Sequence, residues 1–158
     1  NCDLSDADLS QRVFLDCEFN SCNLSGSNFV KTGLKNIKFR ECKLLGLHFE
    51  NCDPFLFAVD FDKCLLSLSS FYKIKLKKTR FKDSNLSEVD FTEADLTSSL
   101  FDNCDLAGAK FERTILEKAD LRTAHNYSID PELNKIKKAR FSRAGITGLL
   151  DKYDIDIE

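Results

Sequence analysis

Large apolar side chains recur at every fifth position through the middle of the chain, and the series misses no position. It reads Leu86, Phe91, Leu96, Phe101, Leu106, Phe111, Leu116 and Leu121. A strand repeats its buried face every two residues and a helix every 3.6 residues, so a period of five fits neither an amphipathic strand nor an amphipathic helix. A short fixed repeat is typical of a solenoid, in which each unit buries its apolar side chain by stacking on copies of itself.

The residue two positions before each of these large apolar residues is small or of modest size. These residues are Ser84, Val89, Ala94, Ser99, Cys104, Ala109, Thr114 and Ala119. We therefore expect one large and one small side chain of every five to point inward together, while the other three face water.

Individual units of the repeat share a recognisable composition. They include Ala94-Asp95-Leu96, Cys104-Asp105-Leu106, Ala109-Lys110-Phe111 and Ala119-Asp120-Leu121. These units resemble the A(D/N)Lxx and AxFxx units of pentapeptide-repeat proteins, and the resemblance covers roughly residues 1–125. It implies an all-β fold, a right-handed quadrilateral parallel β-helix with four pentapeptides in each coil.

Four pentapeptides make twenty residues, so residues twenty apart should stack on adjacent coils, about 4.8 Å apart like neighbouring strands of a sheet. The columns that result are uniform in composition: Phe61, Phe81 and Phe101; Leu66, Leu86 and Leu106; Phe71, Phe91 and Phe111; Leu76, Leu96 and Leu116. We expect these columns to fill the inside of the coil.

One irregularity interrupts the repeat near residues 51–57. The spacing between Phe49 and Phe61 is twelve, which is two fives plus two extra residues, and Pro54 suits a turn better than a laddered strand. If Leu56 takes the inward place, all four columns stay in phase across the break. The sequence thus predicts one continuous rod over residues 1–125 with a two-residue bulge, on which Phe55 or Phe57 is displayed.

A different pattern follows Ala124, where the repeat stops. Asp130, Pro131 and Glu132 suit an N-cap, a first helical residue and an acidic first turn, so we expect a short helix from about Pro131 to Lys138. Phe141 lies twenty positions after Leu121, and this spacing predicts a last partial coil within residues 126–158.

Apolar and acidic residues alternate at the carboxyl end, which is the pattern of an edge strand. Two interpretations stay open. The tail is a cap that covers the exposed end of the solenoid, or its apolar side chains form a two-fold dimer contact. The residues concerned are Leu149, Leu150, Tyr153, Ile155 and Ile157.

The seven cysteines favour a reduced, structural role. Six of them fall in the small inward position, and only Cys52 lies in the irregular segment. Their number is odd and no CxxC pair occurs, so we expect neither disulfides nor a zinc site, and a cytoplasmic location. No apolar run is long enough to span a bilayer, so we expect a soluble protein with no membrane association.

Charge is distributed unevenly along the chain. Residues 31–82 carry twelve basic and five acidic residues, net +7, and residues 83–120 carry three and ten, net −7. Residues 1–30 carry one basic and five acidic residues, net −4. Successive segments of a solenoid are successive levels of a rod, so these sums predict acidic, basic and acidic bands. We expect solvated faces rather than a binding code. The basic band lacks a helix for a DNA groove and interleaved exposed aromatic residues, so direct nucleic-acid binding is not expected.

Catalysis finds little support in the sequence. Phosphate-binding loops, nucleophile elbows and HExxH motifs do not occur, and His48 and His125 fall at outward or irregular places. We expect a protein that is not an enzyme and holds no cofactor or metal. A stiff rod with flat faces instead predicts a non-catalytic scaffold that binds a protein partner. The alternative is a purely structural module of a larger chain.

The segment from Cys17 to Leu24 resembles the quinolone-resistance branch of the family, whose members act on the bacterial type II topoisomerases, DNA gyrase and topoisomerase IV. The resemblance implies that an acidic rod imitates duplex DNA in the enzyme. The candidate residues are Asp90, Glu93, Asp95, Asp102, Asp105 and Asp120, with the displayed Phe55 and Phe57 as further candidates for partner binding. The basic band and the lack of a long projecting loop depart from that branch.

Overall fold

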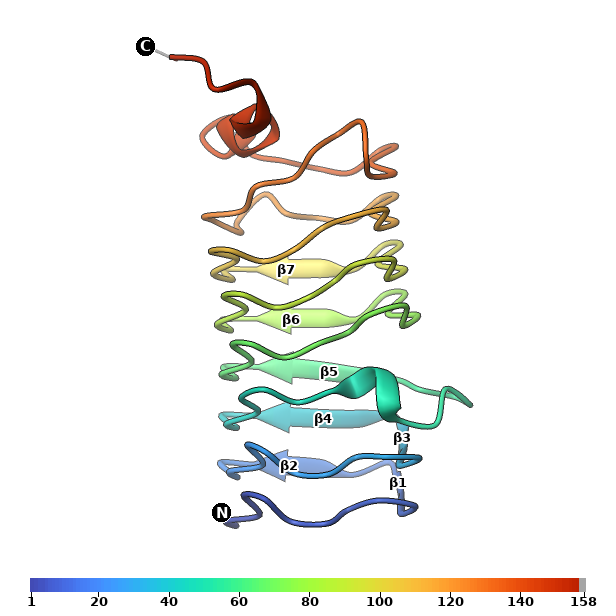
Figure 1. Ribbon diagram of the computed structural model, residues 1–158. Helices are drawn as coiled ribbons and strands as arrows, with labels where there is room; N and C mark the ends of the chain where they lie inside the picture. Colours follow the sequence, from blue (N-terminus) through green and yellow to red (C-terminus); the bar gives the residue numbers. More distant parts are fainter. Residues whose placement is uncertain (157–158) are drawn as a thin grey trace.

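The chain winds as a stack of similar coils, with its two termini at opposite ends of the stack (Figure 1). This architecture is seen in a computed structural model that describes residues 1–156. One sheet pairs β1 (Val13–Leu15) with β3 (Gly33–Lys35). The other has the order β2 (Glu18–Asn20), β4 (Ile37–Arg40), β5 (Val59–Asp62), β6 (Arg80–Lys82) and β7 (Leu100–Asp102). Every strand pair is parallel, so the expected all-β solenoid is confirmed.

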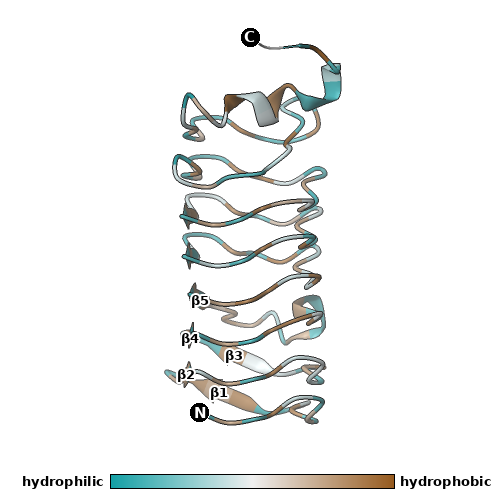
Figure 2. Cartoon of the chain, turned by 90° about the vertical axis from the view of Figure 1, so that its left-hand side faces the viewer, coloured by the Kyte–Doolittle hydropathy of each residue, from teal (hydrophilic) through white to brown (hydrophobic). Residues whose placement is uncertain are grey.

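The coil length of twenty residues is confirmed by the pairing register. Phe81 pairs with Phe101, and isolated bridges continue the same spacing from Leu100 to Asp120 and from Asp120 to Arg140. Backbone hydrogen bonds of 2.7–3.4 Å join each coil to the next along the stack. Apolar and polar residues alternate along each turn of the chain (Figure 2).

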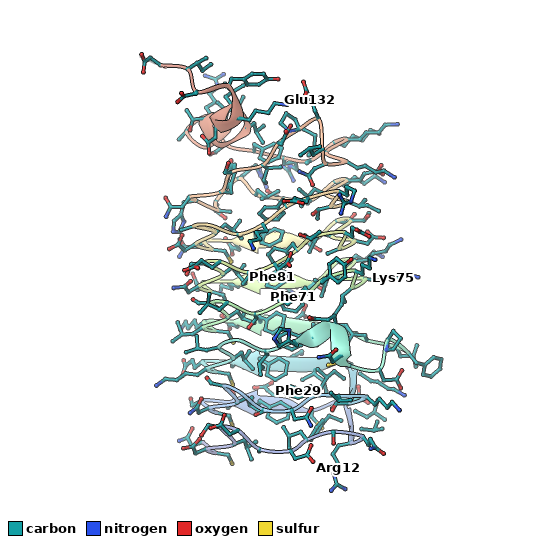
Figure 3. The ribbon with its side chains drawn as sticks, in the orientation of Figure 1. Arg12, Phe29, Phe71, Lys75, Phe81 and Glu132 are labelled. Carbon is teal, nitrogen blue, oxygen red and sulfur yellow. The ribbon has the colours of Figure 1, made fainter. Side chains whose placement is uncertain are left out.

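Two columns of phenylalanine rings fill the interior. In one column neighbouring ring centroids lie 5.0–5.4 Å apart, and the rings are stacked: Phe19, Phe39, Phe61, Phe81 and Phe101. The second column is also stacked, with spacings of 4.5–6.1 Å: Phe29, Phe49, Phe71, Phe91 and Phe111. From Phe49 to Phe101 the two columns meet edge to face at 5.8–6.1 Å, which is a favoured geometry for aromatic pairs. Figure 3 shows Phe71 and Phe81 inside the stack.

Polar residues in the small inward position are satisfied by hydrogen bonds to the coil beneath them. The hydroxyl of Ser99 donates to the carbonyl of Leu76 at 2.6 Å, and the hydroxyl of Thr114 donates to that of Phe91 at 2.9 Å. Because a buried polar group is costly only when it lacks a partner, Ser, Thr and Cys can replace Ala at this position.

Most corners of the coil turn on a residue with a positive φ angle, which recurs every five residues over much of the chain. Gly108 is one of these residues, with a φ of 68°, and a Cβ atom there would lie 3.2 Å from the side chain of Glu88. Lysine and acidic residues hold most of the other corners, although a left-handed conformation costs them more than it costs glycine. The hydrogen bonds between coils hold these corners in place.

The two extra residues lie between Asp53 and Val59. Asp53 is bridged to Gly33 with a spacing of twenty, whereas Val59 pairs with Ile37 with a spacing of twenty-two. The expectation that Leu56 takes the inward place is wrong, because its side chain is 64% exposed and its φ angle is 58°. The 3₁₀ helix η1 (Phe49–Asn51) precedes this insertion, which projects from one side of the stack (Figure 1).

The α-helix expected from Pro131 to Lys138 is also wrong. Residues 131–133 form a turn, and no α-helix occurs within residues 1–156. The chain instead stays in the stack, because Lys135 forms a β-bridge with Ile115. The side-chain amide of Asn134 fills the small inward position and donates a hydrogen bond to the carbonyl of Phe111 at 2.8 Å. The last helices of the described chain are short 3₁₀ helices, η2 (Ile146–Leu149) and η3 (Asp151–Tyr153).

We predict that the Phe91→Ala substitution lowers the free energy of unfolding by about 3–5 kcal/mol, because it leaves a cavity among four neighbouring rings. Phe55→Ala is the matched control, since the ring of Phe55 is 64% exposed, and it should change stability by less than about 0.5 kcal/mol. Urea denaturation followed by circular dichroism measures both. Losses of equal size would show that the ring columns do not hold the coils together.

Candidate interaction surfaces

The six carboxylates singled out in the sequence do not form one surface. Because each pentapeptide is one side of the coil, their positions follow from the pentapeptide to which each belongs. The pentapeptide of Phe91 carries Asp90 and Glu93, that of Leu96 carries Asp95, that of Leu106 carries Asp105, and the face of β7 carries Asp102 and Asp120. The structure therefore spreads them over all four faces.

Several of these carboxylates have a local structural role. The side chain of Asp90 accepts a hydrogen bond from the backbone N–H of Thr92 at 2.8 Å, and that of Asp95 accepts one from Thr97 at 3.1 Å. The same contact, from a side-chain oxygen to the N–H two residues later, is made by Asp3, Asp8, Asn23, Asn28, Asp53, Asn85, Asp105, Asp120 and Asp130. It is an Asx turn, which Asp and Asn form equally well, so the recurrent acidic residue of the repeat serves the turn.

Some of the candidate carboxylates are also neutralised by basic neighbours. Glu93 lies 2.9 Å from the guanidinium of Arg113 and 3.5 Å from the ammonium of Lys73, and Asp95 lies 3.1 Å from that of Lys77. The hydrogen bond from Arg113 holds the pKa of Glu93 below its ordinary value. These pairs reduce the net negative charge available to a partner.

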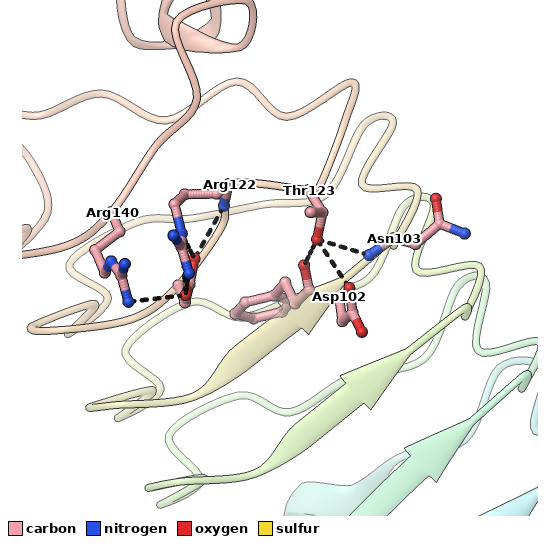
Figure 4. A network of polar contacts seen from close by, with 7 residues as sticks. Asp102, Asn103, Arg122, Thr123 and Arg140 are labelled. Atoms are coloured by element: carbon pink, nitrogen blue, oxygen red, sulfur yellow. Dashed lines mark hydrogen bonds and ion pairs between the residues drawn. The ribbon is translucent and has the colours of Figure 1, made fainter.

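A further polar network joins the last coils on the sheet face (Figure 4). The carboxylate of Asp120 lies 2.8 Å from the guanidinium of Arg122 and 3.4 Å from that of Arg140. The hydrogen bond from Arg122 lowers the pKa of Asp120. Beside it, the hydroxyl of Thr123 donates to Asp102 at 3.1 Å. Both candidate carboxylates on this face are therefore engaged within the protein.

Charges alternate from coil to coil on the five-stranded sheet. Its paired residues are Lys38 with Asp60, Arg40 with Asp62, Asp62 with Lys82, and Lys82 with Asp102. Opposite charges directly across neighbouring strands stabilise a sheet modestly. This face therefore lacks the broad basic and acidic bands expected from the charge of successive segments.

One other face carries a large excess of positive charge. We call it the lysine face and define it as residues 75–78, 95–98, 115–118 and 135–138, which are brought together by the bridges that link positions 75, 95, 115 and 135. It holds seven lysines and two carboxylates, a formal charge of +5. The opposite face, residues 65–68, 85–88, 105–108 and 125–128, holds two carboxylates and neither lysine nor arginine.

The lysines of this face are exposed, and most are free of ion pairs. Lys77 alone pairs with a carboxylate, that of Asp95, among the residues that the structure describes. The other six are Lys75, Lys78, Lys118, Lys135, Lys137 and Lys138. Figure 3 shows Lys75 extending away from the stack. The sequence signal for this face is the recurrence of lysine at multiples of twenty residues, as at Lys78, Lys118 and Lys138. Net charge summed over consecutive segments does not reveal this spacing.

The two aromatic residues of the insertion differ in exposure. Phe55 is displayed as expected, with its ring 64% exposed and the ammonium of Lys35 4.8 Å from the ring centroid. Phe57 is half-buried and packs edge to face against Phe49, with ring centroids 6.5 Å apart. The insertion thus places one aromatic ring on the surface and uses the other for packing.

A groove lies between the insertion and the next coil. We call it the insertion groove; its volume is about 370 Å³, and its lining includes Leu56, Phe57, Tyr72, Lys73, Ile74 and Lys75. Its walls are mainly apolar, and its charged lining residues are two lysines and the carboxylate of Glu50. Lys75 belongs to both the insertion groove and the lysine face, so the two features are continuous. The sequence could not predict this groove, because its shape depends on how far the insertion stands out.

All seven cysteines are free thiols, and most are buried. Burial raises the pKa of Cys52 and that of Cys104 to about 12. The hydrogen bond with the Cys42 thiol, together with burial, also raises the pKa of Cys64. Cys52 is not irregular as the sequence suggested, because it stacks above Thr32 in the small inward position.

The carboxyl-terminal segment is tied back to the turn at residues 130–132. The ammonium of Lys152 lies 2.7 Å from Asp130 and 2.6 Å from Glu132, and both carboxylates raise the pKa of Lys152. Leu149 packs against the core and Leu150 is half-buried, whereas Tyr153 and Ile155 are exposed. The expected edge strand is absent from residues 153–156, and Ile157 lies outside the described residues. The dimer contact through this tail stays a prediction.

Within residues 1–156, no group of three or more His, Cys, Asp or Glu side chains is placed to hold a metal ion. In the same part of the chain, none of the helices has the length and apolar character needed to cross a bilayer.

Comparison with known proteins identifies similar sequences and folds. A family model described as "Pentapeptide repeat region" matches residues 1–54 and 55–126. No curated protein matches the sequence. Two structures of trypsin-treated variants of QnrB1, described as a plasmid-mediated fluoroquinolone resistance protein, are similar in fold. One has a TM-score of 0.63 and 17% identity, covering 100% of this chain and 87% of that chain. The other has a TM-score of 0.56 and 22% identity, covering 100% and 86%.

We predict that Asp90→Asn leaves stability almost unchanged, whereas Asp90→Ala lowers it by about 0.5–1.5 kcal/mol, because Asn retains the hydrogen bond to the N–H of Thr92 and Ala loses it. Chemical denaturation of the two variants beside the unmodified protein measures the difference. If Asn costs as much as Ala, the negative charge and not the turn would be what this position supplies.

We predict that alkylation by iodoacetamide separates the thiols by burial and pKa. Cys2 is exposed and Cys17 is half-buried, so both should react within minutes at pH 8, whereas Cys52, Cys64 and Cys104 should react only after denaturation in guanidinium. Mass spectrometry of peptides from the native and denatured reactions locates the label. Reaction of Cys104 at the rate of Cys2 would contradict its place in the core.

Proposed function

This chain belongs to the pentapeptide-repeat family, and we propose that it is a non-catalytic scaffold that binds a protein partner through the outward faces of its β-helix. The observation that supports this most directly is the filled interior. Two interlocking ring columns occupy the space inside the coil, so the interior of the rod is filled by side chains where a deep catalytic pocket would need open space. Rigid faces can bind a partner with little loss of conformational entropy.

We further propose that the partner is a bacterial type II topoisomerase. The fold similarity to a fluoroquinolone resistance protein covers this whole chain and most of the other, and this extent supports the proposal. The finer idea, that the rod imitates DNA with a row of carboxylates, has less support. The candidate carboxylates are spread over four faces, and Glu93, Asp95 and Asp120 are each paired with basic side chains.

A supercoiling assay with purified DNA gyrase tests this proposal. At micromolar concentration, we predict that the protein restores supercoiling in the presence of an inhibitory fluoroquinolone, or inhibits supercoiling when no drug is present. The variant Asp90→Asn/Asp102→Asn/Asp105→Asn removes three negative charges while keeping side chains that can accept the same hydrogen bonds. Loss of the effect in this variant would support DNA imitation, and its persistence would exclude those carboxylates.

The absence of both protection and inhibition by folded protein would overturn the topoisomerase proposal. Circular dichroism of the same sample shows whether the protein is folded. A destabilised Phe91→Asp variant, in which a charge enters the ring column, serves as the inactive control because an unpaired buried charge disrupts the core.

A further inference from the structure

We propose that the lysine face and the insertion groove together bind an acidic protein segment that carries an apolar side chain. This inference rests on the proposed scaffold function and names the class of segment that the scaffold receives. Two features support it: the uncompensated charge of the face and the apolar walls of the groove that adjoins it.

The charge of the lysine face is not neutralised within the protein. Six of its seven lysines form no ion pair among residues 1–156, and the face carries +5 overall although the whole chain carries −3. Positive groups concentrated on one side of a rod attract an acidic partner and accelerate its association. The face also orients that partner, because the opposite side carries only negative charge.

The spacing of the lysines suits an extended segment. Lys75 and Lys135 are three coils apart in the bridge series, which corresponds to roughly 14 Å at strand spacing. An extended chain advances about 3.3 Å per residue, so carboxylates about four residues apart can reach both clusters. The two coils between them carry Asp95 and Glu117 on this face, and neutral residues of the segment can lie opposite those carboxylates.

The insertion groove supplies the apolar part of the site. Leu56, Phe57 and Ile74 line it, and its volume of about 370 Å³ admits an apolar side chain. Lys75 lies on its rim and also begins the lysine face. A single segment can therefore insert a Leu or Phe side chain into the groove while its carboxylates contact the lysines.

These features favour a protein segment over a nucleic acid. The coil of Asp95 carries no lysine, so it interrupts the positive charge along which a continuous phosphate backbone would have to lie. The exposed rings of Phe55 and Tyr72 each have a lysine ammonium 4.8 Å from the ring centroid, which limits their use for stacking on bases. Apolar walls receive an aliphatic or aromatic side chain better than the polar edge of a base.

Fluorescence anisotropy with defined probes tests the inference. The first probe is a fluorescein-labelled twelve-residue peptide of Asp and Glu with a central Leu-Phe pair, and the second has Ser-Ser in place of that pair. We expect the first to bind with micromolar affinity, the second to bind at least five-fold more weakly, and both to weaken as NaCl rises from 50 to 300 mM.

Two double variants with the same change in net charge provide the matched comparison. Lys75→Glu/Lys78→Glu alters the lysine face, and we expect it to weaken binding of the first peptide at least ten-fold. Lys43→Glu/Lys110→Glu alters exposed lysines on two other faces, and it should weaken binding less than two-fold. Equal weakening by the two variants would show non-specific attraction and overturn the inference.

A third variant examines the insertion groove alone. Leu56→Asn removes an apolar wall at an exposed position with a φ angle of 58°, where Asn is better tolerated than Leu, so the fold should be retained. It should weaken binding of the Leu-Phe peptide about three-fold or more and leave the Ser-Ser peptide unchanged. An equal effect on the two peptides would remove the groove from the proposal.

Further measurements on the same variants distinguish an acidic peptide from other molecules that could bind the lysine face. Tighter binding of a labelled twenty-nucleotide oligo-dT than of the acidic peptide would assign the face to nucleic acid and overturn the proposal. Salt-sensitive self-association in sedimentation that Lys75→Glu/Lys78→Glu abolishes would assign it to a second copy of the chain, again overturning it. The peptide assay contains no topoisomerase, so failure of peptide binding with intact gyrase protection would reject this inference and leave the proposed function standing.

Discussion

The contact between rings on successive half-coils constrains the whole structure. Each central ring stacks on the rings one coil above and one coil below, and it also meets the opposite column edge to face; Phe81, for example, lies 5.2 Å from Phe61 and 5.9 Å from Phe91. A ring that moved along the axis would lose contacts on three sides, so the columns fix the rise of the coil together with the parallel hydrogen bonds. The rigidity of the outer faces follows from this interior.

The same constraint determines which positions are free for function. Two residues of each pentapeptide are committed to the core, one turns the corner in a left-handed conformation, and the residue before the large apolar one often forms an Asx turn. An abundance of Asp in such a protein is therefore weak evidence of an acidic binding surface. Positions whose residues make no contact within the coil are more informative, and the six lysines of the lysine face that form no ion pair among residues 1–156 are such a group.

The sequence predicted the parts of the fold that depend on its period. The ring columns and the coil length of twenty follow from residues that repeat without error. Sequence reasoning failed where a local pattern is compatible with two structures. Asp130 and Pro131 suit the start of a helix and an Asx turn equally well. The stacking of Lys135 on Ile115 favours the turn. The placement of Leu56 depended on where the two extra residues are inserted, which spacing alone cannot determine. Net charge summed over consecutive segments also failed to predict the charge of each face. Every five consecutive residues cover one face and its corner, after which the chain passes to the next face.

The position before the large apolar residue shows what the lysines of the lysine face cost in stability. On this face the position is Asp95 in one coil, where its side chain accepts a hydrogen bond from Thr97, but it is Lys75 and Lys135 in two others. A lysine has no acceptor and cannot form the Asx turn, so each of these coils forgoes a hydrogen bond worth about 0.5–1.5 kcal/mol. Lys75 and Lys135 are also repelled by the neighbouring lysines at residues 77 and 137. Stability alone would favour Asp or Asn at both places. Lysine also holds this position on other faces, at Lys43 and Lys110, so the lysine face is distinguished by the clustering of its unpaired lysines. Binding of the proposed acidic segment would offset the repulsion within that cluster.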